Sequence, residues 1–445
     1  MQEKVKIKII YFLVFLFITS MSLENLLNFQ FLNLIRVSIV EICFLLLSLF
    51  SLIFFYDKVF IYIKNLNNFK LFDLILYFTL ILKLIKILIN PSPINIYELF
   101  IWIYMILIFN LFNFLQSYDQ KIRDILNFSI VSLSILISFF VIFSLFIYFI
   151  FPNFFEFLDI KNYLNNDTLL WTVKEIHYPY YGENSVHFFG FVYGQNKAAF
   201  LLIPGYFIFL HLYKLRKLIN VSIFIIFISC LLLIKAKILY LVILFTIFYF
   251  LFNNNKFKFL FSRGLSLIYL FIIIFIYYVF THFLILDPET INNINEAKYS
   301  YYYTKYPIFE TMYFEVYGSL FLKLKLIALN LIYENYLILF SGTNIINYSE
   351  ILSNYPNGHD ISSEYFSLMA NYGIILSVPF FYIILYFFYF FTKNFYNKNF
   401  ISLNLPICII LTIFSIEAML SEILHFQQLW VLYSIFYISL KTKLR

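Results

Sequence analysis

The chain has 445 residues, of which 63% are hydrophobic and 12% are charged, with a mean hydropathy of +0.86. These proportions exclude an ordinary soluble domain, which is about half apolar and a quarter charged. The net charge of +7 does not indicate a nucleic-acid partner, because lysines gather on the cytoplasmic loops of membrane proteins. The three cysteines (Cys43, Cys230 and Cys408) fall in apolar segments and predict neither a disulfide framework nor a metal site.

Apolar segments recur along the whole chain, and most are long enough to cross a bilayer, which takes about 20 residues. Because backbone amides in lipid must be hydrogen-bonded within their own segment, these segments predict helices. The sequence therefore predicts an all-α, polytopic integral membrane bundle, with residues 1–445 forming a single domain. Twelve spans are expected near residues 7–23, 37–56, 70–89, 97–116, 124–151, 198–213, 218–234, 237–252, 264–286, 368–392, 401–418 and 424–440.

The distribution of basic residues predicts the orientation of these spans. With the N-terminus inside, the inside loops hold 19 of the 31 Lys and Arg residues, so both termini are expected in the cytoplasm. Two long loops then lie outside, at residues 152–197 and 287–365, and loops of this length are usually functional. Within the second loop, Val316–Phe340 is apolar but interrupted by charges, which predicts a helix lying on the membrane surface.

Motifs of soluble enzymes are absent from the sequence. It contains no GxxxxGK[ST], HExxH or GxSxG pattern, so any chemistry must come from the outside loops and the helix ends. Charged residues in or near spans are the first candidates, because burying them in lipid is costly. Glu41 and Glu417 fall inside predicted spans, and we expect both to hydrogen-bond between neighbouring helices.

Two pairs of lysines face the outside in this topology. Lys235 and Lys237 interrupt a long apolar stretch at a short turn. They either extend to the membrane interface as isolated charges or bind a phosphate group. The same two interpretations apply to Lys323 and Lys325 on the expected surface helix. Residues spaced by two point about 200° apart on a helix, so at most one of that pair faces a given ligand.

The segment Asn354–Leu376 brings a polar turn to the start of a predicted span. His359 in this turn is able to take a proton from a hydroxyl group near neutral pH. Asp360 and Glu364 are nearby carboxylates, but adjacency in sequence does not make His359 and Asp360 a dyad. The alternative is that His359 caps the helix that follows.

These elements occur in a characteristic order. The stretch GFVYGQNKAAFLLIPG (Gly190–Gly205) leads a span, Lys235 ends the next span, basic residues follow in the long loop, and GHDISSEYFSLMANYGIIL contains His359. In this order and in its layout of spans, the chain resembles the O-antigen polymerase and O-antigen ligase superfamily of bacterial envelope enzymes.

Individual residues carry the resemblance. Asn196, with Gly190 and Ala199, fits the family's first element, and Gly373 fits the glycine that follows the family histidine, His359. The chain departs from the family in four respects, which are Asp360 in place of Asn, His187 where many members have Arg, Ser377 near the second glycine, and lysines in place of arginines. A lysine keeps the positive charge but lacks the bidentate geometry of arginine.

The resemblance implies a metal-independent, inverting glycosyltransferase without cofactors, acting at the periplasmic face of the bacterial inner membrane. Its donor would be an undecaprenyl-pyrophosphate-linked glycan, held by Lys235, Lys237 and one of Lys323 and Lys325. His359 would activate the hydroxyl of a glycan acceptor, and His187, Asn196, Asp360 and Glu364 would support the substrates. Membrane lipids and a chain-length regulator protein are the other expected partners.

Three functions remain open. A polymerase takes a second lipid-linked oligosaccharide as acceptor, whereas a ligase takes lipid A-core, and the same residues would serve both. We favour the polymerase. A lipid-linked oligosaccharide flippase or other transporter would instead show internal repeats and a path of ionisable groups through several spans. The long outside loops and the absence of visible repeats count against that class.

Overall fold

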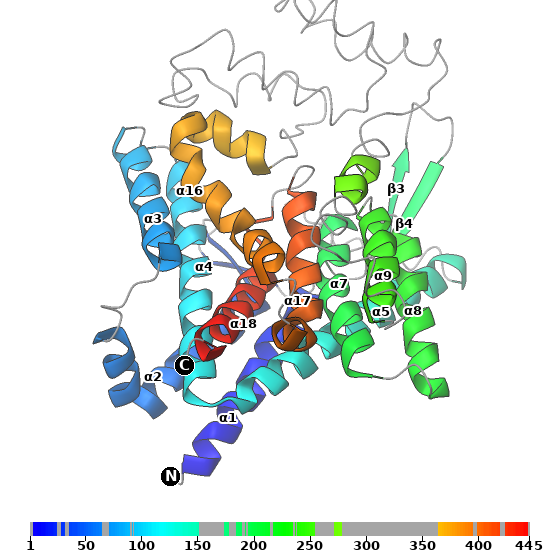
Figure 1. The fold of residues 1–445 in the computed structure, drawn as a ribbon, viewed down its shortest axis with the longest axis horizontal. Helices are drawn as coiled ribbons and strands as arrows, with labels where there is room; N and C mark the ends of the chain where they lie inside the picture. Colours follow the sequence, from blue (N-terminus) through cyan, green and yellow to red (C-terminus); the bar gives the residue numbers. More distant parts are fainter. Residues whose placement is uncertain are drawn as a thin grey trace, which may run out of the picture.

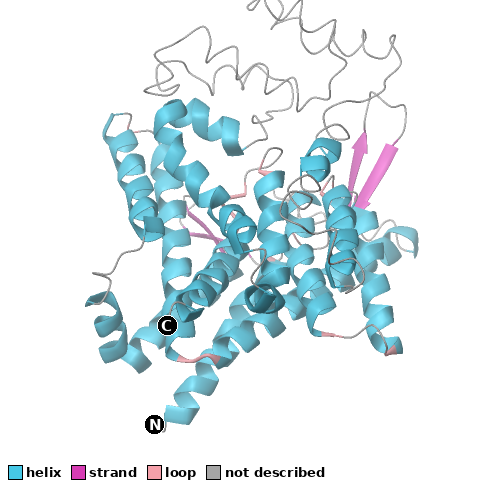
Figure 2. Ribbon diagram, viewed as in Figure 1, coloured by secondary structure: helices cyan, strands magenta, loops and turns pink. Residues whose placement is uncertain are grey.

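The structure is a computed structural model, and it describes residues 3–24, 28–31, 35–64, 71–89, 91, 93–150, 173–177, 184–188, 192, 195–213, 217–234, 236, 238–253, 271–277, 364–394, 398–418 and 423–443. Helices make up nearly all of this part of the chain (Figure 2). The elements are α1 (Glu3–Ser20), the 3-10 helix η1 (Met21–Leu23), β1 (Asn28–Phe31), β2 (Ile35–Ser38), α2 (Ile39–Lys64), α3 (Leu71–Ile89), α4 (Pro93–Tyr118), α5 (Lys121–Ile150), β3 (Val173–His177), β4 (Asn184–Phe188), α7 (Gln195–Leu212), α8 (Leu218–Ile234), α9 (Leu239–Asn253), α16 (Glu364–Asn394), α17 (Lys398–Glu417) and α18 (Gln427–Lys443).

The helical fold confirms the predicted class. Within the described residues, four segments are long and apolar enough to cross a membrane: Glu3–Leu23, Ile39–Tyr62, Asn95–Tyr118 and Lys121–Phe146. Helix α3 carries more charge, and five further apolar helices are shorter: Asn196–Leu212, Leu218–Ile234, Leu239–Phe250, Tyr372–Tyr386 and Leu405–Glu417. Of the predicted span 264–286, residues 271–277 are described, and they are helical. Helix α18 begins three residues later than the span predicted there, at Gln427.

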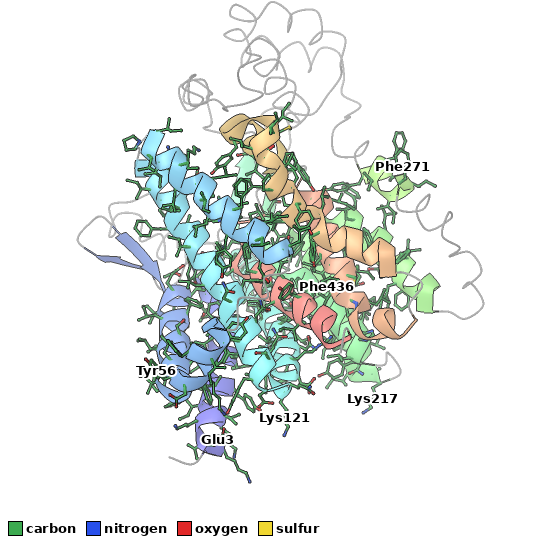
Figure 3. The ribbon with its side chains drawn as sticks, turned by 60° about the vertical axis from the view of Figure 1, so that its left-hand side comes forward. Glu3, Tyr56, Lys121, Lys217, Phe271 and Phe436 are labelled. Carbon is green, nitrogen blue, oxygen red and sulfur yellow. The ribbon has the colours of Figure 1, made fainter. Side chains whose placement is uncertain are left out.

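Both chain termini lie at the same end of the bundle, which is the lower end in Figure 1. The turn between α3 and α4 lies at the opposite, upper end, with α3 at the left of the bundle and α8 and α9 at the right. Glu3, Lys121 and Lys217 all lie toward the lower end, whereas Phe436 lies in the centre (Figure 3). Residues predicted to face the inside therefore gather at the end that holds the termini.

Two antiparallel hairpins lie within the predicted outside segments. Strands β1 and β2 pair between α1 and α2, with Asn28 opposite Ser38. Strands β3 and β4 pair between α5 and α7, with Val173 opposite Phe188. Strand β4 also contacts α5 and α8, which ties this part of the first long loop to the bundle.

Two tryptophans join α4, α16 and α18 at the centre of the bundle. The rings of Trp102 and Trp430 pack edge to face at 5.3 Å, and Trp102 also contacts Phe380 at 5.5 Å. Each indole N–H has a partner, since Trp102 donates to Thr79 Oγ1 at 3.1 Å and Trp430 to the Leu424 carbonyl at 2.8 Å. Buried indoles with paired N–H groups combine large apolar contact with defined orientation, so these contacts hold α4 in register with its neighbours.

The two glutamates predicted to link helices behave differently. Glu417, which is 2% exposed, accepts a hydrogen bond from the hydroxyl of Tyr277, so the prediction is confirmed for this residue. For Glu41 the prediction is wrong. Its carboxylate instead accepts hydrogen bonds from the backbone N–H and the hydroxyl of Ser38, at 2.8 Å for the N–H. Ser38 and Glu41 have the spacing of a capping box, in which a serine is followed three residues later by a glutamate. Their hydrogen bonds stabilise the start of α2.

Helices α5 and α7 approach each other closely beside a proline. Pro204 lies inside α7, where it lacks an N–H and disturbs the helical hydrogen bonds. The nearby Leu201 carbonyl accepts hydrogen bonds from Ser134 Oγ of α5 at 3.0 Å and from Gln428 Nε2 of α18 at 3.4 Å. Side chains of neighbouring helices commonly compensate a proline in this way in membranes. A Cβ atom added at Gly205 would lie 2.1 Å from Ser134 Oγ, so the glycine permits the approach.

Gly205→Ala is expected to destabilise the protein by about 2 kcal/mol, the usual cost of overpacking a close contact. The reason is the overlap of the new methyl group with Ser134 and with the Ile130 carbonyl, 2.8 Å away. Thermal unfolding in detergent measures the change. The double variant Gly205→Ala/Ser134→Gly removes part of the overlap and is expected to recover part of the loss. Equal stability of Gly205→Ala and wild type would contradict this packing.

Candidate functional site

Helix α3 carries two lysines on the face that packs against the rest of the protein. Its buried residues recur at the three- and four-residue spacing of one helix face; they are Phe72, Asp73, Leu76, Thr79, Leu82, Lys83 and Lys86. The opposite face carries exposed apolar residues such as Leu84 and Leu88. Lys83 and Lys86 are only 6% and 7% exposed, so both side chains are directed into the protein.

One carboxylate lies between the two ammonium groups. Because α3 ends at Ile89 and α4 begins at Pro93, the short turn brings Glu98 alongside the last turns of α3. One carboxylate oxygen of Glu98 accepts a hydrogen bond from Lys83 Nζ at 3.3 Å and lies 3.8 Å from Lys86 Nζ. Two buried cations therefore share a single anion here. We call Lys83, Lys86 and Glu98 the charged cluster.

Aromatic rings surround the charged cluster on the protein side. Lys83 Nζ lies 5.4 Å from the ring centre of Trp102, 5.6 Å from that of Tyr372 and 5.9 Å from that of Phe380. Lys86 Nζ lies 5.1 Å from the ring centre of Tyr372. Cations are attracted to ring faces at these distances, more strongly when water is excluded. The rings thus stabilise two positive charges that one carboxylate neutralises only in part.

A bend in α16 positions one of these rings. Gly373 has φ 77° and ψ 165°, a conformation that costs glycine little but strains other residues, and it divides α16 into two segments. Tyr372 directly precedes the bend, and its ring stacks on Phe380 at 4.8 Å. The glycine that supported the family resemblance therefore orients the helix that packs Tyr372 against the charged cluster.

A second ion pair lies at the start of α7. Lys197 Nζ contacts both carboxylate oxygens of Glu24, at 2.7 Å and 2.5 Å, and the two side chains are only 17% and 18% exposed. Lys197 Nζ also lies 5.8 Å from the ring centre of Phe426. This pair joins the end of the first helical segment to α7 and to the turn that precedes α18.

His425 lies in that turn, ahead of α18, and connects the two groups of charges. Its dehydrated surroundings lower the pKa of the imidazole from 6.5 to about 4, and positive Lys83 and Lys197 act in the same direction while Glu98 opposes them. A group whose pKa is lowered in this way carries no charge at neutral pH. The imidazole is therefore a neutral hydrogen-bonding group beside the cations.

The arrangement suits an anion. The described side chains of this region include three lysines and two carboxylates. Lys197 contacts both carboxylate oxygens of Glu24. Lys83 and Lys86 share the other carboxylate, that of Glu98. Lysine ammonium groups bind phosphate oxygens as point charges, whereas a metal ion would be repelled by them. Lys83 and Lys86 therefore have the chemistry to bind a phosphate or carboxylate group.

Most residues singled out in the sequence lie outside the described part of the chain; these are Lys235, Lys237, Lys323, Lys325, His359 and Asp360. Asn196 is the second residue of α7 and directly precedes Lys197, so the family's first element adjoins the Glu24 ion pair. Glu364 is the first residue of α16. His187 belongs to β4, opposite Lys174 in β3. The structure therefore places Asn196 next to Lys197 of the Glu24 ion pair, and the predicted roles of all these residues stay untested.

The charged cluster was missed because Lys83 and Lys86 counted only toward the orientation of the spans. A helical projection of residues 71–89 would have shown both lysines on the face that carries Phe72, Leu76 and Thr79. A lysine on the inner face of a span needs a partner, and Glu98 is the nearest carboxylate after the turn. The contribution of His425 has no such signal, because it depends on helices far apart in sequence.

No family model, curated protein or solved structure matches the chain. The fold and the site therefore define the class. This is a predominantly helical protein whose apolar helices indicate a membrane location. At the end remote from its termini it buries two lysines that share one carboxylate.

Proposed function

We propose that this protein is a glycosyltransferase that polymerises undecaprenyl-pyrophosphate-linked oligosaccharide units at the periplasmic face of a bacterial inner membrane. The proposed topology has twelve spans with both termini in the cytoplasm. The observation that carries the proposal is the charged cluster, because two buried lysines with one shared carboxylate provide a site for an anionic group. Intramembrane ionisable groups are functional candidates by default.

The position of the cluster agrees with the resemblance to the polymerase and ligase superfamily. Asn196 starts α7 beside Lys197, and Tyr372 and Gly373 follow the proposed catalytic segment into α16. His359 is five residues ahead of Glu364, the first residue of α16. Helix α16, which contains Gly373, packs against α3, which carries the two buried lysines.

In the proposed reaction, His359 accepts the proton of the attacking acceptor hydroxyl. The hydroxyl oxygen bonds to C1 of the donor sugar as the bond between C1 and the pyrophosphate oxygen breaks, which inverts C1. The departing pyrophosphate takes the electron pair. Lys235, Lys237 and one of Lys323 and Lys325 stabilise its charge, and preorganised cations act most strongly where charge develops. Pyrophosphate is a good leaving group, so the step uses neither a metal ion nor a covalent intermediate.

Expression in a strain that lacks its own polymerase tests the proposal. The chain is expected to restore a ladder of long polysaccharides, whereas a ligase would transfer existing glycans to lipid A-core without lengthening them. Lys235→Ala is expected to reduce chain growth about tenfold, because one of several cations is lost. Lys217→Ala is the matched control, since Lys217 lies at the opposite end of the protein (Figure 3). The absence of any ladder at normal protein levels of the wild type would refute the function.

A further inference from the structure

The two lysines of α3 do not adopt the position that an isolated lysine takes in a membrane helix. Such a lysine extends along the lipid-facing side until its ammonium group reaches the interface. Lys83 and Lys86 are instead buried between α3, α4 and α16, and the lipid-facing positions of α3 carry residues such as Leu88. Burying two like charges three residues apart is unfavourable unless an anion compensates them.

Among the described residues, the ion pairs of both lysines converge on one carboxylate. Glu98 supplies one negative charge to two ammonium groups, and a single oxygen makes both contacts, at 3.3 Å and 3.8 Å. His425 is neutral, and Lys197 already contacts both oxygens of Glu24. An anionic ligand at this position would add a second negative charge to a site that holds two lysines. Glu98 is 24% exposed, so it is also the most accessible member of the cluster.

The surroundings of Glu98 identify the kind of molecule that reaches it. On α4 the neighbouring side chains of Tyr97 and Phe100 are both 65% exposed, and on α3 Leu88 is 83% exposed. Exposed apolar side chains on a helix of this kind contact lipid chains. A hydrocarbon chain on this surface would bring a headgroup to the α3–α4 turn, one or two helical turns from both lysines.

We propose that the charged cluster binds the phosphate or diphosphate headgroup of a membrane lipid, and that Glu98 is a built-in counter-ion which the headgroup displaces from Lys86. In the empty site Glu98 neutralises part of the lysine charge. In the occupied site the headgroup oxygens contact Lys86 and Lys83, and Glu98 turns toward the exposed side of the turn.

The lysines of this site are different residues from those assigned to the donor pyrophosphate. Helix α3 lies at the left of the bundle, and α8 and α9, whose connection contains Lys235 and Lys237, lie at the right (Figure 1). A polymerase handles two lipid-linked molecules, one as donor and one as acceptor. The identity of the lipid as the acceptor glycolipid rests on the proposed function, whereas the headgroup site does not.

Ligand titration of the full-length protein in a non-ionic detergent tests the site. The probe is farnesyl diphosphate, with farnesol as the uncharged control, and the readout is tryptophan fluorescence, because Trp102 lies 5.4 Å from Lys83 Nζ. Lys86→Gln is expected to weaken binding about tenfold and Glu98→Gln to tighten it about tenfold, since each changes one charge beside the anion. Lys86→Arg keeps the charge and should bind as wild type does.

Two variants at the opposite end serve as matched controls. Lys58→Gln and Glu3→Gln make the same changes in an exposed ion pair of 3.1 Å, and they are expected to leave the dissociation constant unchanged. Equal binding of farnesol and farnesyl diphosphate would overturn the site. So would wild-type affinity in Lys86→Gln, which tests the proposal even if Glu98→Gln does not fold.

Competition experiments identify which lipid supplies the headgroup. A comparison of binding with polysaccharide synthesis distinguishes the headgroup site from the proposed function. Phosphatidylglycerol that competes with farnesyl diphosphate, with the same dependence on Lys86, supports the site and identifies a common phospholipid as occupant. If undecaprenyl diphosphate competes and phosphatidylglycerol does not, the result supports the site and identifies a lipid-linked substrate as its occupant. A wild-type chain that makes no polysaccharide but binds farnesyl diphosphate through Lys86 refutes the proposed function and leaves the headgroup site standing.

Discussion

His359→Ala is expected to reduce polysaccharide elongation at least about 100-fold, which is the lower range for loss of a general base. The reason is that the acceptor hydroxyl has a pKa far above neutral and attacks C1 slowly unless its proton is removed as the new bond forms. Gel analysis of polysaccharide length in a strain lacking its own polymerase measures the loss. A purified preparation with lipid-linked oligosaccharide gives the rate directly.

The control for this prediction is a histidine remote from the proposed reaction. His211 is in the last turn of α7, at the end opposite the Lys197 ion pair. His211→Ala should therefore leave elongation unchanged at equal protein levels. Elongation by His359→Ala at the wild-type rate would show that another group accepts the proton. His425, neutral and beside the charged cluster, is the next residue to test in that case.

Helix positions were the most predictable feature, and the reason is physical. In a bilayer each apolar segment must satisfy its own backbone hydrogen bonds, so composition and length alone determine where a helix forms. The span expected at 218–234 coincides with α8, and that expected at 70–89 differs from α3 by one residue. The capping box of Ser38 and Glu41 could also have been read from the spacing, but the glutamate was assigned to a contact between helices.

The two hairpins were less predictable. Strands β1 (NFQF) and β2 (IRVS) alternate polar and apolar residues, but over only four positions each, which is the shortest run that indicates a strand. Strand β4 contacts α5 and α8. These contacts arise only once the helices have packed, so no local signal in the sequence specifies them.

The candidate site depends on contacts between residues that are far apart in the sequence, and such contacts could not be predicted from local patterns. Lys83 and Lys86 were not singled out from the sequence, and their position on the buried face of α3 is what makes their charges costly. The ring of Tyr372 reaches them from a helix more than 280 positions later in the chain, through a bend at Gly373. Gly373 and Asn196 were singled out from the sequence, and they lie at the bend of α16 and in the first turn of α7.

Glu98→Gln is expected to give the largest loss of stability at this site, about 3 kcal/mol in the ligand-free protein, as for other broken buried ion pairs. The substitution keeps the size of the side chain but leaves Lys83 and Lys86 as two buried cations without their shared carboxylate. Lys83→Met should cost less, because Lys86 and Glu98 then form a balanced pair. Thermal or denaturant-induced unfolding in detergent measures both changes.

The triple variant Lys83→Met/Lys86→Met/Glu98→Gln separates stability from binding. It removes all three charges and replaces the lysines with apolar side chains of similar length, so it should recover most of the stability lost in Glu98→Gln. It should still fail to bind farnesyl diphosphate, because no cation remains for the headgroup. Glu3→Gln, at the exposed ion pair with Lys58, should leave unfolding unchanged. If the charged cluster served only to hold α3 against α4, the triple variant would be as functional as it is stable. Recovery of stability without recovery of binding instead means that the protein keeps an unfavourable pair of buried lysines for the sake of an anionic ligand.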